Sequence, residues 1–98
     1  MSDNVKEITE ERGKNYGHPI KHFYCTQTMY HYWLQAREQS SQNLGLKKET
    51  AIRHGVYMIL DKLARLSENA EHRDNLDDIA GYAKCIGMIL DKECDDAY

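Results

Sequence analysis

The sequence predicts an all-α protein, a small helical bundle with one short and three long helices. Three stretches repeat apolar residues every three or four positions, which is the period of one helix face. No stretch alternates apolar and polar residues as a half-buried strand does. The 98 residues contain one proline and six glycines, so little of the chain is expected to be irregular. This length fits one domain, and we expect residues 1–98 to form a single all-α domain.

The first helix is expected to be short, over residues 4–12. Asn4 suits its N-cap position, and Gly13 can adopt the positive φ that often ends a helix. Residues 13–18 are therefore expected to form a turn. Lys14 lies in this turn, whose free N–H groups near the next helix start can seat a phosphate; the alternative is a solvated loop.

The second helix is expected over residues 19–39. Pro19 suits its first turn, where a missing N–H costs nothing. Its apolar face consists of Ile20, Phe23, Gln27, Tyr30 and Leu34. A chain this short buries a smaller share of its surface than a larger domain does. We therefore expect an aromatic face with Phe23, Tyr30 and Trp33 to associate with a second copy, which would make the protein a homo-oligomer.

Two further helices are expected, over residues 47–67 and 74–93. Asp74 is a candidate N-cap for the later one, with Asp77 three residues on. The apolar positions of the earlier helix are Ile52, Val56, Ile59, Leu60, Leu63 and Leu66. Those of the later helix are Leu76, Ile79, Ala83, Ile86 and Leu90.

Charge and cysteine content restrict the class of protein. The net charge is −3, whereas a general nucleic-acid binder usually carries a basic excess, so nucleic acid is not an expected partner. No apolar run approaches the roughly 20 residues of a membrane span, so no membrane association is expected. Three cysteines without a CxxC pair fit reduced thiols. These features predict a cytoplasmic protein.

Two lines of polar residues are expected to meet between the last two helices. Lys62 and Arg65 are neighbours three residues apart. Asp74, Asp78 and Tyr82 follow one another every four residues on the next helix. A short connection makes the two helices antiparallel neighbours, so the two lines should face each other. They form either an interhelical ion-pair network or a pocket whose cations hold phosphate.

Three segments together carry a family resemblance, namely Tyr16-Gly17, residues 60–66 and residues 74–83. In this pattern the chain resembles a group of small phage and prophage proteins of unassigned function. That group is itself similar to the MazG-like all-α nucleotide pyrophosphatases and to domains linked with nucleotide modification. The resemblance implies a MazG-like bundle, often oligomeric, with a nucleotide site between helices, located in the host cytoplasm if the chain is phage-encoded. It adds Tyr16 to the candidate binding residues.

A departure from the MazG-like pattern bears on catalysis. Those pyrophosphatases carry an ExxE pair on one helix and an ExxD pair on the next, which together bind Mg²⁺. In the first set Asp61 is the one acidic residue and points away from the apolar stripe, while Lys62 and Arg65 add positive charge. Asp74 and Asp78 are four residues apart rather than three. We therefore expect no catalytic residue, no metal site and no cofactor. Mg²⁺ is expected as a cofactor only if the protein has retained pyrophosphohydrolase activity.

Three functions remain open. The preferred one is binding or sequestration of a nucleotide, for instance a host signalling nucleotide, in a polar interhelical pocket without hydrolysis. The second is inhibition of a host protein, for counter-defence or host takeover, with the bundle as a binding platform. The third is divergent Mg-dependent nucleotide pyrophosphohydrolase activity. The residues expected to bind the ligand are Lys62, Arg65, Asp74, Asp78, Tyr82, Tyr16 and Lys14.

Overall fold

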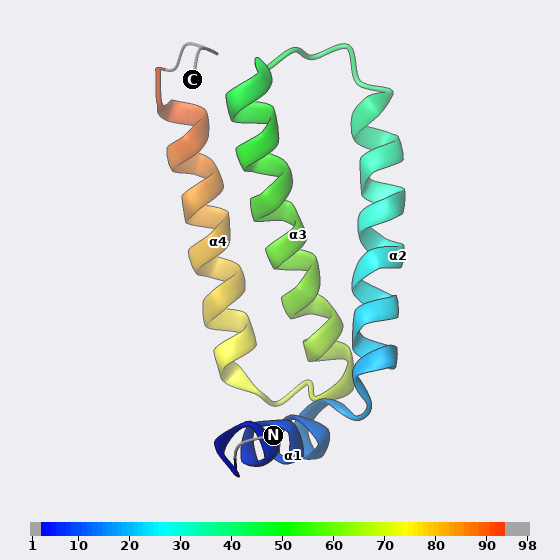
Figure 1. Ribbon diagram of the computed structural model, residues 1–98. Coiled ribbons are helices and arrows are strands. Elements are labelled where there is room, and N and C mark those ends of the chain that lie inside the picture. Colours follow the sequence, from blue (N-terminus) through cyan, green and yellow to red (C-terminus); the bar gives the residue numbers. More distant parts are fainter. Residues whose placement is uncertain (1–2, 94–98) are drawn as a thin grey trace.

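A computed structural model describes residues 3–93, although the side chains of residue 3 and of residues 12–16 are outside the described set. All regular structure in the described residues is helical, which confirms the all-α class with one short and three long helices (Figure 1). No helix among these residues is long and apolar enough to cross a membrane. The helices are α1 (Asp3–Tyr16), α2 (Pro19–Glu38), α3 (Leu46–Glu68) and α4 (Arg73–Asp91).

The break between α1 and α2 falls at Gly17, so the expected stop at Gly13 is wrong. A glycine inside a helix costs about 1 kcal/mol relative to alanine, and the helix continues despite that cost to Tyr16. Gly17 has a φ of 72°, a conformation that side chains disfavour. His18 then caps α2, since its Nδ1 accepts a hydrogen bond from the N–H of Ile20 at 3.2 Å.

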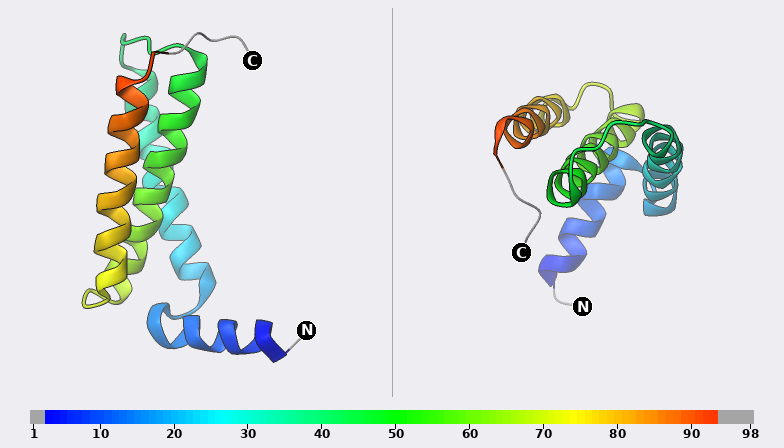
Figure 2. Two further views of the ribbon diagram at one scale, coloured as in Figure 1. Left: turned by 90° about the vertical axis from the view of Figure 1, so that its left-hand side faces the viewer. Right: turned by 90° about the horizontal axis from the view of Figure 1, so that it is seen from above.

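The three long helices form an open layer with α3 in the middle. In the described part of the chain, α2 and α4 both pack on α3 and do not touch each other. Figure 2 shows this row of helices from the side and from above, with α1 crossing its lower end. An open row buries each outer helix on one side only, so much of the apolar surface remains accessible.

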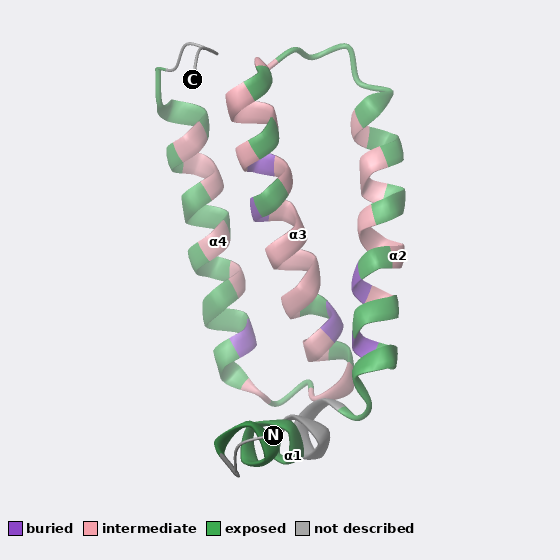
Figure 3. Ribbon diagram, in the orientation of Figure 1, coloured by how far each residue is buried: buried purple, intermediate pink, exposed green. Residues whose placement is uncertain are grey.

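The core of the single chain is correspondingly small. Among the described residues, Ile52 and Ala64 are the buried apolar side chains, and both belong to α3. Three polar residues are also buried: His22, Thr26 and Asn75. Figure 3 shows how few positions are buried along the four helices.

The face that α2 turns towards α3 differs from the predicted apolar stripe. The buried residues of α2 are His22 and Thr26, whereas Ile20 and Phe23 are exposed. Tyr30 does pack within the chain, because its ring meets that of Tyr57 edge to face at 5.2 Å. The buried face of α2 therefore combines aromatic packing with polar groups, among them His22, which bonds to Asp61 of α3.

Near its upper end the α2–α3 contact is a charge network centred on Glu49. Arg37 donates hydrogen bonds to this carboxylate from α2, and Arg53 donates one from the next turn of α3 at 2.9 Å. The Arg37 and Arg53 hydrogen bonds hold the pKa of Glu49 below its usual value. Since the folded-state pKa is depressed, this network stabilises the fold above the ordinary pKa and weakens as the pH falls through the folded-state value.

We therefore predict that Glu49→Gln loses part of the acid sensitivity of the fold. In the unaltered chain, the free energy of unfolding should decline below about pH 4.5, the ordinary glutamate value, because the carboxylate must be protonated. Urea unfolding at neutral pH and in acid measures the difference. Glu38→Gln is the matched control, since Glu38 lies 3.9 Å from Arg53 and is exposed. Equal acid sensitivity in the unaltered chain and Glu49→Gln would contradict the prediction.

Candidate functional site

Lys62 and Asp78 are brought together as the sequence predicts. The Nζ atom of Lys62 on α3 lies 3.0 Å from Oδ2 of Asp78 on α4. Asp78 is 47% exposed, so water screens the pair and its contribution to stability is small. The pairing leaves the cation largely neutralised, and this favours the ion-pair interpretation over a phosphate pocket at this position.

Arg65 forms a different contact from the one expected. Its Nε atom lies 3.4 Å from Oδ2 of Asp61, four residues earlier on α3. The other carboxylate oxygen of Asp61 accepts a hydrogen bond from His22 Nε2 on α2 at 2.7 Å. Asp61 was expected to point away from the apolar stripe; it points towards α2, because the central helix packs on two sides. The three side chains form a polar cluster that joins α2 to α3.

The remaining predicted residues are not joined to these pairs. Asp74 is exposed in the first turn of α4 and is not the N-cap, which is His72; no ion pair to Asp74 occurs among the described residues. Its carboxylate still suits a helix N-terminus electrostatically. Tyr82 is half-buried one turn beyond Asp78. Lys14 and Tyr16 lie in the last turns of α1, and their side chains are outside the described set.

Two of the three carboxylates considered for magnesium, Asp61 and Asp78, are engaged with cations, whereas Asp74 is exposed. Asp61 contacts His22 and Arg65, and Asp78 contacts Lys62. Within residues 3–93, no group of three or more His, Cys, Asp or Glu side chains is placed to hold a metal ion. Mg²⁺ requires several oxygen ligands in near-octahedral geometry. The pyrophosphohydrolase alternative therefore draws no support from this arrangement.

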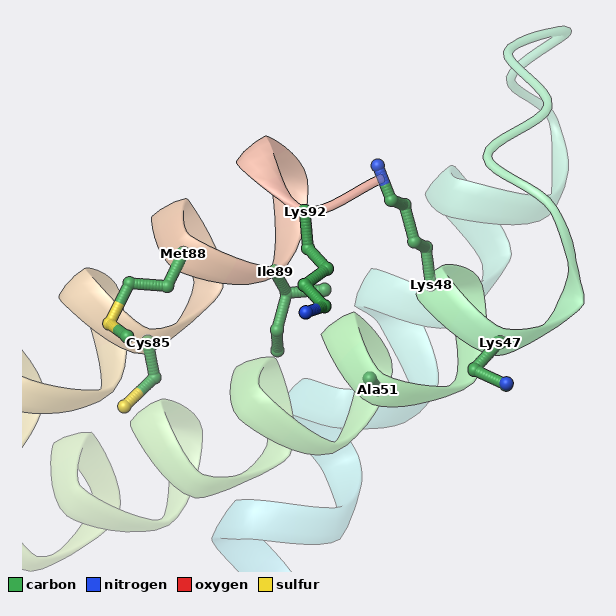
Figure 4. Close-up of a pocket in the computed structure, with 7 residues that line it drawn as sticks. All are labelled: Lys47, Lys48, Ala51, Cys85, Met88, Ile89 and Lys92. Atoms are coloured by element: carbon green, nitrogen blue, oxygen red, sulfur yellow. The ribbon is translucent and has the colours of Figure 1, made fainter. Parts of the chain in front are cut away.

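A more suitable ligand site lies higher between α3 and α4, in a groove of about 470 Å³. Ala51, Met88 and Ile89 give it an apolar floor, and Lys92 reaches across the floor from α4 towards α3 (Figure 4). The residues lining this groove, called the lysine groove below, are Lys47, Lys48, Ala51, Cys85, Met88, Ile89 and Lys92. A volume in this range is typical of small-molecule sites.

The electrostatics of the lysine groove suit an anion. Among the described residues, its lining contains three lysines and no acidic side chain, although the chain as a whole carries a net charge of −3. Lys48 donates a hydrogen bond to the carbonyl of Leu90 at 3.1 Å, which ties α3 to the end of α4. The N-terminus of α3 opens beside these lysines without a side-chain cap. Free N–H groups and the helix dipole at such an end add positive potential.

A second cavity, of about 590 Å³, lies between α2 and α3 and is less suited to an anion. Tyr30 and Tyr57 provide aromatic surface there, but Glu49 also lines the wall. Arg53, its main cation, is already bonded to Glu49 and lies near Glu38. A bound phosphate would have to compete with these carboxylates, whereas the described residues that line the lysine groove include no carboxylate.

Sequence reasoning missed the lysine groove, although the expected pairing contained a signal for it. Lys62 opposite Asp78 fixes the register of the antiparallel helices. Ala51 comes eleven residues before Lys62, and Ile89 comes eleven residues after Asp78, so the same register places these two opposite each other. Extending the Lys62–Asp78 pairing along the two helices would have predicted that Lys47, Lys48 and Lys92 lie near one another.

Fold and groove together define an all-α protein with a cation-rimmed groove between two antiparallel helices. The chain belongs to the family described as Domain of unknown function (DUF6378), whose model matches residues 1–90. The Gene 55 protein of Mycobacterium phage D29 is 33% identical over 97 residues, which cover 94% of this chain and 57% of that protein. The chain thus spans little more than half of this curated relative.

The relative supports the expected resemblance to small phage proteins of unassigned function. No solved structure matches the chain. The similarity to MazG-like pyrophosphatases therefore stays a prediction from the sequence pattern.

Proposed function

We propose that the protein binds a nucleotide in the lysine groove and does not hydrolyse it. The observation that carries this proposal is the combination of three lysines and an uncapped helix N-terminus around an apolar floor. Lysine ammonium groups bind phosphate as point charges, and the apolar floor can cover a base. A host signalling nucleotide is one ligand of this class. Sequestration needs no catalytic group, in keeping with the engaged carboxylates of α3 and α4.

The proposed site differs from the one expected from the sequence. Eleven residues separate Ala51 from Lys62, which is about 17 Å along a helix. The Lys62–Asp78 pair therefore lies well below the lysine groove and is assigned a structural role. This separation makes Lys62 a useful control for Lys92, since both are lysines on the same helix pair.

We predict that Lys92→Glu weakens nucleotide binding about tenfold to a hundredfold, because the change removes one charged contact and adds repulsion. Lys62→Met should leave the affinity unchanged. Calorimetric titration with a nucleoside and its mono-, di- and triphosphates measures these affinities. Affinity should rise with phosphate number and fall with added salt. Chromatography of the recovered triphosphate, after incubation with Mg²⁺, should show it intact.

Several results would contradict the proposal. Equal affinity for the nucleoside and its triphosphate would remove the role of the lysines. A loss of binding in Lys62→Met but not in Lys92→Glu would move the site to the lower pair. Mg²⁺-dependent release of pyrophosphate that is lost in Asp78→Asn would place the protein among the enzymes.

A second candidate function is inhibition of a host protein through the outer face of α2. The observation favouring it is the exposure of Tyr24 and Tyr32, two turns apart on that helix. Tyrosine is enriched among residues that dominate protein interfaces. The absence of any nucleotide response, together with a host partner whose affinity falls in a Tyr24→Ala, Tyr32→Ala variant, would favour this function over nucleotide binding.

A further inference from the structure

One side of the α3–α4 pair carries an apolar stripe that the described residues cover only in part. On α3 the spacing alternates between four and three residues, as in helices that pack side by side. Leu63, within this stripe, is 38% exposed. The α3 positions are Ile52, Val56, Ile59 and Leu63, of which Ile52 is buried within the chain and Val56 and Ile59 are half-buried.

The neighbouring helix repeats the pattern on the same side. Leu76 and Leu90, at opposite ends of its stripe, are 41% and 48% exposed. The α4 positions are Leu76, Ile79, Ala83 and Leu90. The α3 and α4 stripes together are called the α3–α4 apolar face below.

The α3–α4 apolar face lies on the side of the layer opposite the lysine groove. Successive residues of a helix are turned by about 100° around its axis. Lys47 and Leu63 are therefore about 160° apart on α3, and Met88 and Leu90 about 160° apart on α4. A partner covering the apolar face would leave the lysine groove open.

The accessible surface area of the whole chain indicates how much surface remains exposed in the monomer. Its accessible surface is 7344 Å², whereas a folded monomer of 11.4 kDa is expected to expose about 5,800 Å². The excess over the whole chain is about 1,500 Å², more than the roughly 800 Å² that each partner contributes to a standard interface, and the exposed Leu63, Leu76 and Leu90 contribute to it. The radius of gyration, 16.2 Å, likewise exceeds the value of about 13 Å for a compact domain of this length.

We propose that a second copy of the chain covers the α3–α4 apolar face. Two such faces related by a two-fold axis place four amphipathic helices around one apolar centre, which is the architecture of a four-helix bundle. A second copy supplies an identical antiparallel pair, so the two faces match in length and spacing. The aromatic residues expected to associate do not form this surface, since Tyr30 stacks on Trp33 and packs on Tyr57 within the chain.

Light scattering coupled to size-exclusion chromatography tests this proposal. The unaltered protein should have twice the chain mass of 11.4 kDa. Leu63→Glu should shift the mass to that of one chain, because it places a charge in the apolar face. Phe23→Glu is the matched control, since Phe23 is an exposed apolar residue of α2 and its variant should stay dimeric. Circular dichroism establishes that each variant remains helical.

If Leu63→Glu does not fold, Leu76→Glu gives the same test in the first turn of α4, where an acidic residue is tolerated. If neither folds, the melting temperature of the unaltered protein decides, because a dimer melts higher as its concentration rises. A single-chain mass at high concentration with a constant melting temperature overturns the proposal. Dissociation in Phe23→Glu with Leu63→Glu still dimeric also overturns it, and assigns the interface to α2.

Discussion

Asp61→Ala is expected to lower the free energy of unfolding by about 3 kcal/mol, the lower end of the range for breaking a buried ion pair from one side, because Asp61 is only partly buried. Asp61 is 15% exposed, and its partner His22 is 4% exposed. Removal of the carboxylate leaves the Nε2–H group of His22 without its acceptor between α2 and α3. The Arg65 guanidinium, 3.4 Å away, loses its contact with this carboxylate in the same change. Urea unfolding of the two proteins at neutral pH measures the difference.

Asp78→Ala is the matched control for this cluster. It removes the same side chain from an ion pair, but Asp78 is largely open to water and its pair with Lys62 is screened. We expect a loss of about 1 kcal/mol or less. Equal losses in the two variants would show that the Asp61 cluster does not hold α2 on α3.

Gly55→Ala is expected to lower the free energy of unfolding by about 1–2 kcal/mol. A Cβ atom at Gly55 would lie 2.8 Å from Cγ1 of Ile86 and 3.2 Å from its Cδ1, so the Ile86 side chain or the α4 backbone would have to shift. Overpacking of this kind costs about 1–3 kcal/mol, and the better helix propensity of alanine returns part of that cost. Thermal and urea unfolding both measure the loss.

The glycine prediction has two internal controls. Gly81→Ala meets no atom within 4 Å, so the same change there should stabilise the fold by about 0.5–1 kcal/mol. In an Ile86→Ala background the contact is removed, and Gly55→Ala should no longer be destabilising. A gain in stability from Gly55→Ala in the unaltered chain would mean that α3 and α4 are not in close contact at this point.

The helices could be predicted from the sequence because their apolar period is local information. The later two expected ranges differ from α3 and α4 by one or two residues at each end. The C-terminal end of α1 was predicted wrongly because either of two glycines could have ended the helix. Gly13 comes first in the sequence, but the helix ends before Gly17, which directly precedes the N-cap residue of α2.

The burial of α2 could not be predicted from hydrophobicity. The apolar stripe containing Ile20 and Phe23 is the obvious candidate for a core face, yet these side chains are exposed. The buried face instead carries His22, whose partner Asp61 lies 39 residues along the chain. A polar pair of this kind has no period in either helix, so the sequence pattern does not reveal it.

The candidate site was predictable only in part, for a similar reason. The Lys62–Asp78 contact follows from helix spacing and a short connection, and the structure contains it. Lys47, Lys48 and Lys92 stand at helix ends, where charged residues usually face solvent. Their shared position around an apolar floor depends on the full length and register of α3 and α4.

Nuclear magnetic resonance of the ¹⁵N-labelled protein during titration with a nucleoside triphosphate and Mg²⁺ tests the central claim most directly. Nucleotide binding in the lysine groove predicts amide shifts at Lys47, Ala51, Ile89 and Lys92, with the phosphorus spectrum still that of intact triphosphate. Shifts centred on Lys62, or no shifts at a saturating concentration, would contradict the claim.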